Sequence, residues 1–169
     1  DSNANMTVKH DISNGVCVPC ARGTYTNSEG SLACKYCEIG KQSTASRSTC
    51  LDCIPGTYSK IDTSLGIPTT ECAQCPKNTY SDTMGSSNCT KCSIGSITYT
   101  KGSTTCVKCP KGTYYTFVNG VNNDSNANMT VKHDISNGVC VPCARGTYTN
   151  SEGSLACKYC EIGKQSTAS

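Results

Sequence analysis

The hydrophobic and polar positions along the chain do not follow the period of a helix. Gly, Thr, Ser and Pro interrupt every window long enough for an amphipathic helix, so no apolar stripe with a 3.6-residue period develops. Segments such as Gly23-Thr24-Tyr25 instead place a turn former directly before residues that favour strands. The pattern therefore predicts short β-hairpins and irregular loops, with little or no helix.

The cysteines give this pattern its period, because all 16 fall into eight C-x-x-C pairs. Each pair opens a unit, and we number the units 1 to 8 by their first cysteines. Six units span 123 residues. The pairs are Cys17/Cys20, Cys34/Cys37, Cys50/Cys53, Cys72/Cys75, Cys89/Cys92, Cys106/Cys109, Cys140/Cys143 and Cys157/Cys160.

A turn former stands six residues after the first cysteine in each of the first six units. It is Gly in all of them except unit 4, which has Asn, and these two residues best tolerate a positive φ. We therefore predict a left-handed turn at this point of every unit. Thr-Tyr follows the turn in four of the six units, and Ile precedes it in the other two. The predicted turn positions are Gly23, Gly40, Gly56, Asn78, Gly95 and Gly112.

A larger repeat contains these units, because residues 1–46 recur letter for letter as 124–169. Surface loops would have drifted if only the fold were maintained, so the identity indicates recent duplication or a mechanism that keeps the copies alike. We interpret 1–123 as one full repeat of six units, with half-repeats 17–71 and 72–139, and 124–169 as the start of the next. The chain is then a window of a longer, elongated tandem array.

Composition argues against a conventional core. Leu, Ile, Val and Phe supply 23 of the 169 residues and Trp is absent, a level at which chains without other support tend to stay disordered. Closing a loop of about 13 residues with a disulfide contributes about 3 kcal/mol in the chain-entropy account. One such bridge per unit can replace the missing core, and it requires an oxidising compartment.

The cysteine pattern admits two other interpretations. The first two pairs have a spacing close to that of four-cysteine zinc sites, but the pairs continue as an unbroken series with uneven steps. C-x-x-C is also the thioredoxin motif, which needs a βαβ setting and a helix N-terminus, and nothing in the sequence supplies them. We therefore expect structural disulfides, with no metal, no cofactor, no catalytic residue and no enzymatic activity.

Spacing leaves two disulfide connectivities open. In a knot scheme neighbouring pairs interlock, as in Cys17–Cys34 with Cys20–Cys37. In a ladder scheme the second cysteine of each pair bonds the first of the next. The ladder is preferred because it suits half-repeats of three units, and it leaves Cys17 and Cys160 to bond outside this window. Its bonds are Cys20–Cys34, Cys37–Cys50, Cys53–Cys72, Cys75–Cys89, Cys92–Cys106, Cys109–Cys140 and Cys143–Cys157.

Charge, hydropathy and surface motifs indicate which kinds of partner to expect. The net charge is only +3 and no run of Lys or Arg forms a nucleic-acid patch. No apolar stretch approaches the length of a membrane span, so we expect membrane attachment only through an anchor that this segment lacks. Glycan acceptor motifs of the N-x-Ser/Thr type stand at Asn5, Asn88, Asn123 and Asn128.

The units resemble known cysteine-rich repeats. The pattern Cys-x-x-Cys-x-x-Gly-Thr-Tyr, then Gly-Ser, then Cys resembles the repeats of growth-factor-receptor and ephrin-receptor type. The tandem form, with Cys109–Tyr115 and Ser/Thr/Asn-rich spacers, is similar to the surface or immobilisation antigens of ciliates. That likeness implies an extracellular, cysteine-periodic coat protein of a kind that is commonly lipid-anchored.

The function expected from these features is structural. We expect a glycosylated, extracellular repeat protein that forms a cell-surface coat or filament, with neighbouring copies of itself as partners. The alternative is a ligand-binding or adhesive receptor ectodomain or stalk. An exposed apolar patch confined to one unit would favour the receptor, and uniform exposure along the units would favour the structural role.

Overall fold

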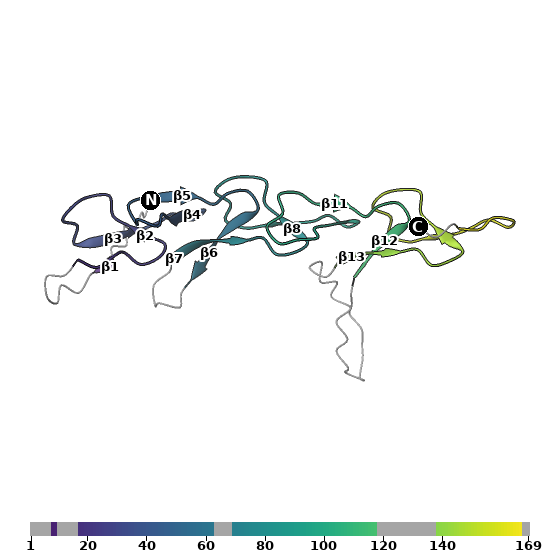
Figure 1. The fold of residues 1–169 in the computed structure, drawn as a ribbon, viewed down its shortest axis with the longest axis horizontal. Coiled ribbons are helices and arrows are strands. Elements are labelled where there is room, and N and C mark those ends of the chain that lie inside the picture. Colours follow the sequence, from purple (N-terminus) through teal and green to yellow (C-terminus); the bar gives the residue numbers. More distant parts are fainter. Residues whose placement is uncertain (1–7, 10–16, 63–68, 118–137, 167–169) are drawn as a thin grey trace, which may run out of the picture. The chain divides into compact units, whose positions relative to one another are not determined.

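The computed structural model describes residues 8–9, 17–62, 69–117 and 138–166. In this part of the chain the ordered structure consists of short antiparallel strands without a helix (Figure 1). The prediction of a small disulfide-rich fold of β-hairpins is therefore confirmed. The strands are β1 (Val8–Lys9), β2 (Thr24–Tyr25), β3 (Ala33–Tyr36), β4 (Lys41–Ser43), β5 (Cys50–Asp52), β6 (Thr57–Asp62), β7 (Thr69–Gln74), β8 (Thr79–Tyr80), β9 (Thr90–Lys91), β10 (Ser96–Ile97), β11 (Val107–Lys108), β12 (Thr113–Phe117), β13 (Gly138–Pro142), β14 (Thr147–Tyr148) and β15 (Lys158–Tyr159).

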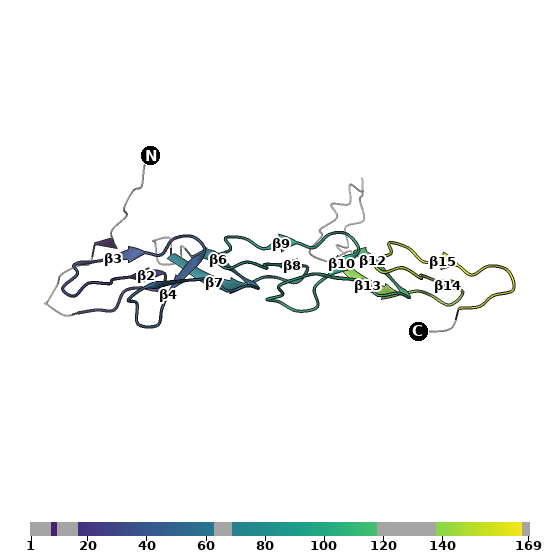
Figure 2. The same ribbon diagram turned by 90° about the horizontal axis from the view of Figure 1, so that it is seen from above.

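The chain divides into two compact bodies, which we describe separately. The first body comprises 1–75 and 81–89, and the second comprises 76–80 and 90–169. The first body holds a three-stranded sheet of order β1-β3-β2 and the hairpins β4–β5 and β6–β7. The second body holds the hairpins β8–β9, β10–β11, β12–β13 and β14–β15 (Figure 2). Each hairpin joins the turn segment of one unit to the cysteine pair of the next.

The same tight turn precedes the first strand of each hairpin. In unit 1 the Thr24 N–H donates to the Ala21 carbonyl at 3.1 Å, across a Gly23 whose φ is +73°. A positive φ at the third residue is what a type II turn requires. The Thr24 hydroxyl donates to the same carbonyl at 2.8 Å. The equivalent hydroxyl bonds of Thr57, Thr79, Thr113 and Thr147 measure 2.6–2.7 Å, which explains why Thr follows the turn.

A backbone bond then joins each turn to the following cysteine pair. The carbonyl of the turn residue accepts the N–H of the second cysteine of the next pair at 2.8–2.9 Å. Because this bond recurs once per unit, it sets the register of each hairpin. The bonds are Cys37 to Gly23, Cys53 to Gly40, Cys75 to Gly56, Cys92 to Asn78, Cys109 to Gly95, Cys143 to Gly112 and Cys160 to Gly146.

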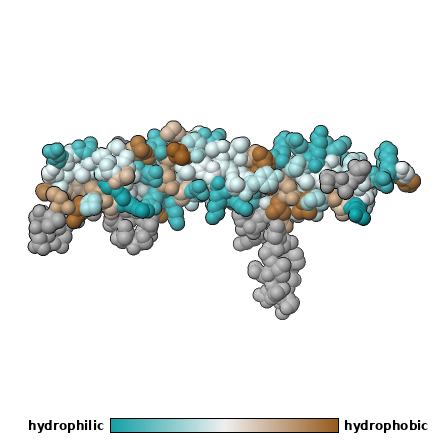
Figure 3. Space-filling view, viewed as in Figure 1, coloured by the Kyte–Doolittle hydropathy of each residue, from teal (hydrophilic) through white to brown (hydrophobic). Residues whose placement is uncertain are grey.

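Burial falls on cysteines and small polar residues rather than on large apolar side chains. Cys53, Cys75 and Cys109 are fully buried, as is Thr24 at 1% exposure. The hydrophobic side chains visible in Figure 3 form small separate patches among hydrophilic ones. The interior of each unit is filled by disulfides and small hydroxyl side chains. The chain can therefore fold with few large apolar residues.

The second body contains one aromatic cluster, formed where β12 pairs with β13. Tyr115 is 5% exposed and packs with Ile97 and Cys109, and Phe117 meets the Tyr115 ring edge to face at 5.2 Å. Burial raises the pKa of the Tyr115 phenol. Gly138 faces this ring so closely that a Cβ there would collide with it. The cluster closes the hairpin that carries the long insertion of unit 6.

Asn78 does more at its turn than accept a φ of +62°. Its side-chain oxygen accepts the Thr98 N–H at 3.3 Å, and its amide donates to the Gly138 carbonyl at 2.9 Å. The residue is 6% exposed, so these bonds form away from water. Sequence reasoning explained the Asn by its backbone tolerance and missed this clamp between units.

We therefore expect Asn78→Gly to destabilise the protein, although Gly occupies this position in the other units. The backbone keeps its conformation, but the buried Thr98 N–H and Gly138 carbonyl lose their partner, and such losses cost about 1–3 kcal/mol. Guanidinium unfolding of the disulfide-intact protein measures this, with the exposed Asn150→Gly as control. Equal stability of Asn78→Gly and the parent chain would contradict the clamp.

Candidate functional site

The disulfides are the first component of the repeated architecture. The structure contains seven, with Cα–Cα distances of 5.4–5.8 Å. In each, the second cysteine of one pair bonds the first of the next, which is the ladder arrangement. Among the described cysteines, Cys17 and Cys160 have no disulfide. The bonds are Cys20–Cys34, Cys37–Cys50, Cys53–Cys72, Cys75–Cys89, Cys92–Cys106, Cys109–Cys140 and Cys143–Cys157.

A polar bond from four of the turns to the next unit is the second component. The turn N–H donates to a Ser or Thr hydroxyl that stands three residues after the turn of the next unit. This pattern escaped sequence reasoning, although a Ser or Thr recurs at that position in most units. The bonds are Gly23 to Ser43 at 3.0 Å, Asn78 to Thr98 at 2.7 Å, Gly112 to Thr149 at 2.9 Å and Gly146 to Ser166 at 2.8 Å.

A junction between half-repeats lies in the first body. The Gly85 N–H donates to the Cys53 carbonyl at 2.8 Å, and the Ser59 N–H donates to the Ser86 carbonyl at 2.9 Å. The Gly85 carbonyl lies against Gly40, where a Cβ would collide with it. The Gly85-Ser86 turn of unit 4 therefore docks on units 2 and 3 through backbone contacts.

The second body contains a junction of the same construction. The Gly153 N–H donates to the Cys109 carbonyl at 2.7 Å, and the Tyr115 N–H donates to the Ser154 carbonyl at 2.7 Å. The Gly153 carbonyl lies against Gly95 in the way that Gly85 lies against Gly40. A Gly-Ser turn thus joins consecutive half-repeats both within the predicted repeat 1–123 and between it and the next.

All six predicted turn residues have a positive φ, between +62° and +90°. Gly40 and Gly95 carry a second constraint that sequence reasoning did not separate from the first. They must lack a side chain because a neighbouring carbonyl touches them. The only signal available in the sequence was that both belong to the Ile-Gly units, which stand in the middle of each half-repeat.

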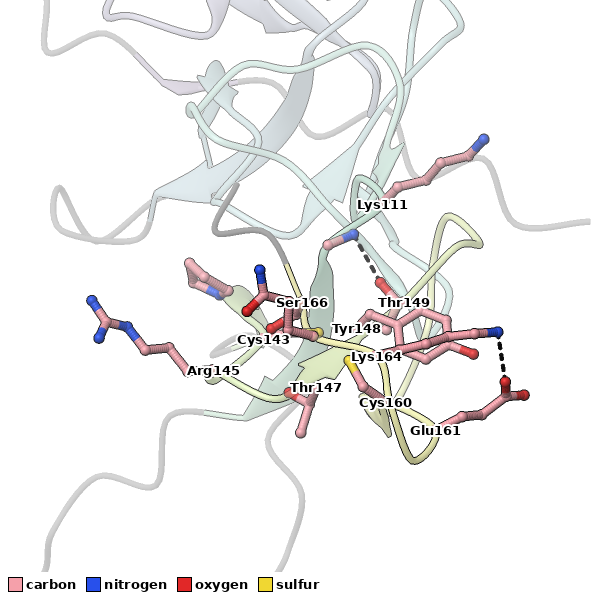
Figure 4. A pocket seen from close by; sticks show the side chains of 13 residues that line it. Lys111, Cys143, Arg145, Thr147, Tyr148, Thr149, Cys160, Glu161, Lys164 and Ser166 are labelled. Atoms are coloured by element: carbon pink, nitrogen blue, oxygen red, sulfur yellow. Dashed lines mark hydrogen bonds and ion pairs between the residues drawn. The ribbon is translucent and has the colours of Figure 1, made fainter.

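Open cavities lie on the described surface of both bodies. The larger, of about 650 Å³, lies in the second body and is lined by residues of units 6, 7 and 8 (Figure 4). Its charged lining includes Lys111, Arg145, Glu161 and Lys164. The smaller, of about 400 Å³, lies in the first body beside Arg22 and Glu71.

The other candidate residues are placed as follows. Asn88 is exposed, in the loop before β9. Asn5, Asn123 and Asn128 lie outside the described residues. In the described part of the chain, no three His, Cys, Asp or Glu residues are grouped to hold a metal ion. No helix there is long and apolar enough to cross a bilayer.

Comparison with protein families gives a match. A family model described as tyrosine-protein kinase ephrin type A/B receptor-like matches residues 10–48, 63–105 and 133–169, which is more than half of the chain. Each matched segment contains a pair of neighbouring units, namely units 1 and 2, 4 and 5, or 7 and 8. The elongated units 3 and 6 fall largely outside the matches. No curated protein matches the chain.

The junction contact predicts different effects of Ala at two glycines with the same local sequence. Gly40 and Gly163 have similar positive φ values of +90° and +82°, but nothing lies within 4 Å of a Cβ at Gly163. The positive φ costs an alanine about 1–2 kcal/mol at either position. We expect Gly40→Ala to cost about 1–3 kcal/mol more, since overpacking typically has that cost.

Guanidinium unfolding of the two disulfide-intact variants checks this difference, with Gly95→Ala as the equivalent change in the second body. Gly95→Ala should behave like Gly40→Ala. If Gly40→Ala and Gly163→Ala lower the free energy of unfolding equally, the close approach of Gly85 contributes nothing.

Proposed function

The chain belongs to the ephrin type A/B receptor-like family of cysteine-rich repeats, and from this premise we propose that it is a non-catalytic building block of an extracellular surface coat or filament. The family is one of receptor-type repeats rather than of enzymes. The seven disulfides and the receptor-type repeats together indicate an oxidising, extracellular environment. The coat or filament role is the part that we propose.

The observation that carries the proposal is the repetition of the junction. Gly85 on Gly40 and Gly153 on Gly95 make the same contacts, although the first joins halves within a repeat and the second joins successive repeats. A junction that does not distinguish these cases can be repeated without limit. Repeats that contact mainly their neighbours increase in length without a growing core, which suits an extended array.

The distribution of exposed apolar side chains also supports a structural role over a receptor. Ile39, Ile94 and Ile162 occupy equivalent positions before the turn, and all three are at least 62% exposed. Leu32 and Leu155 form another exposed equivalent pair. Among the described residues, these exposed apolar side chains recur from unit to unit rather than gathering in one unit. The similarity in composition to ciliate surface antigens points the same way.

The partners that fit this function are neighbouring copies of the repeat and attached glycans. Nucleic acid has no place in the proposal. A ligand-binding or adhesive receptor stalk is the alternative that the family allows. No feature of either body favours it over the coat.

Tandem chains of one, two and three 123-residue repeats test the array. If every junction is alike, small-angle X-ray scattering should show a maximum dimension that rises by a constant increment per repeat. A chain that folds back into one globule would instead enlarge only as about the 0.38 power of its length. That slower increase would reject the filament.

Glycan attachment at Asn88 can be tested separately. The side chain is exposed and its motif is completed by the exposed Thr90, so an oligosaccharyltransferase can reach it. Expression through a eukaryotic secretory pathway should yield a species that loses one glycan mass in Asn88→Gln. Ser87→Gln is the control and should keep that mass. An unchanged mass in Asn88→Gln would exclude this site.

A further inference from the structure

The amide clamp of Asn78 in the second body has no counterpart in the first body, where Gly23 occupies the equivalent turn position. Both residues stand six positions after the first cysteine of their units, and both have a positive φ, of +62° and +73°. The turn N–H donates to an equivalent hydroxyl in each case, that of Thr98 at 2.7 Å and that of Ser43 at 3.0 Å. The two turns are therefore built alike and differ by one carboxamide side chain.

The two backbone groups that bind this carboxamide do have counterparts in the first body. In the second body they are the Thr98 N–H, 3.3 Å from the Asn78 Oδ1, and the Gly138 carbonyl, 2.9 Å from its Nδ2. Ser43 corresponds to Thr98, because each supplies the hydroxyl that binds the turn. Thr70 corresponds to Gly138, because each stands two residues before the next cysteine pair.

The hairpin registers point both first-body groups away from their own partner strands. In β4 the Thr44 N–H bonds across the hairpin to the Thr49 carbonyl at 3.0 Å. Because such bonds alternate along an antiparallel pair, the Ser43 N–H points the other way. The same alternation turns the Thr70 carbonyl of β7 outward from β6. Among the residues that the structure describes, neither group has a hydrogen-bond partner.

These groups share one cavity. Gly23, Ser43 and Thr70 all line the first-body cavity of about 400 Å³. The cavity therefore lies where the Asn78 carboxamide lies in the second body, and it presents an N–H and a carbonyl to whatever fills it. Gly23 and Thr70 are buried, and buried backbone groups without partners are destabilising. An amide supplies the acceptor and the donor that both groups need.

The rest of the lining is polar and includes a strained arginine. Arg22 pairs with Glu71 at 3.3 Å, and the Arg47 guanidinium donates to the Ser43 hydroxyl at 3.1 Å. Arg47 has a φ of +56°, a backbone conformation that is unfavourable for a residue with a side chain. Such strain favours a role for the side chain that is kept there. The corresponding turns of other units use glycine at a positive φ, namely Gly30, Gly85, Gly102 and Gly153.

We propose that this cavity binds the acetamido group of an N-acetylated sugar. The acetamido carbonyl would accept the Ser43 N–H, and its N–H would donate to the Thr70 carbonyl, as the Asn78 carboxamide does with the equivalent groups. The side chains of Arg47 and Glu71 would bind the ring hydroxyls. The volume falls within the range of small-molecule pockets, about 300–1,000 Å³. The site goes beyond the proposed coat and does not depend on it, although glycans on neighbouring copies would carry such a sugar.

An NMR titration of the isotope-labelled, disulfide-intact chain tests the site. N-acetylglucosamine should shift the Ser43 amide resonance in a saturable way. Glucose, which lacks the acetamido group, should bind about ten-fold more weakly, because the two buried groups then lose their partners. Equal binding of glucose, or no saturable shift up to the solubility limit of N-acetylglucosamine, would reject the site. Asparagine amide is the peptide-like probe, and tighter binding of it than of the sugar would overturn the sugar assignment.

Gly23→Asn provides the matched variant, because it places in the cavity the side chain that the second body already has there. The positive φ at this position suits Asn. Binding of N-acetylglucosamine should fall about ten-fold or more. Gly30→Asn is the control in the same body, since Gly30 also has a positive φ and nothing lies within 4 Å of a Cβ there. If Gly23→Asn binds the sugar as tightly as Gly30→Asn, the cavity is not its site.

Arg47→Gly decides the question even if Gly23→Asn does not fold, because glycine is the residue of the equivalent turns. Non-reducing mass mapping first verifies that the seven bridges are intact. Removal of the guanidinium should weaken N-acetylglucosamine binding about ten-fold. An unchanged affinity would show that the sugar does not occupy this cavity. Neither result bears on the scattering behaviour of the tandem chains.

Discussion

The structure depends on one constraint, which is that each unit is tied to the next twice at the same point. A disulfide joins the second cysteine of one pair to the first of the next, and the turn carbonyl accepts the N–H of that next pair's second cysteine. The covalent bond limits how far the units can separate, and the backbone bond fixes their register. The buried side chains between the disulfide and the backbone bond have only to be small and to find a hydrogen-bond partner nearby. That is why hydroxyls and sulfur fill the interior where leucines stand in a conventional domain.

The consequence for packing is that specificity depends on the backbone. At the half-repeat junctions, Gly85 and Gly153 approach Gly40 and Gly95 too closely for any side chain. The contacts consist of backbone N–H and carbonyl groups of glycine, cysteine, serine and tyrosine. Because such contacts tolerate most side-chain changes nearby, the surface of each unit can vary while the joint stays the same. At these junctions the residue type is restricted only where a neighbouring carbonyl leaves no room for a side chain, as at Gly40 and Gly95.

The sequence predicted the fold class because its signals were local. The C-x-x-C period, the Gly-Thr-Tyr turns and the scarcity of apolar residues each act within one unit, and together they indicate disulfide-tied hairpins without helix. What it did not predict was long-range. The amide clamp of Asn78 reaches Gly138, far along the chain, and Tyr115 packs against Gly138 across the insertion of unit 6. No periodic pattern marks such contacts, since each occurs once.

The candidate site shows the same division. The turn positions were predicted from residue type, because positive φ selects Gly and Asn. The second role of Gly40 and Gly95 could not be predicted, because a close approach by a distant carbonyl leaves no mark on a position that the positive φ already makes glycine. The cavity beside Gly23 was also beyond sequence reasoning. Gly23 and Asn78 satisfy the same turn, so only the structure shows that a side chain fills this space in the second body and not in the first.

The ladder of disulfides has a mechanical consequence. Under tension, the residues inside each closed loop bear no load, because the bridge carries the force past them. Between Cys34 and Cys37, for example, only a three-residue step can straighten, to about 10 Å, before the next bridge at a Cα–Cα distance of 5.7 Å takes the load. Even with every hydrogen bond broken, a pulled chain would stop after a short travel. The disulfide-bridged part of the molecule therefore has a short maximum extension under tension.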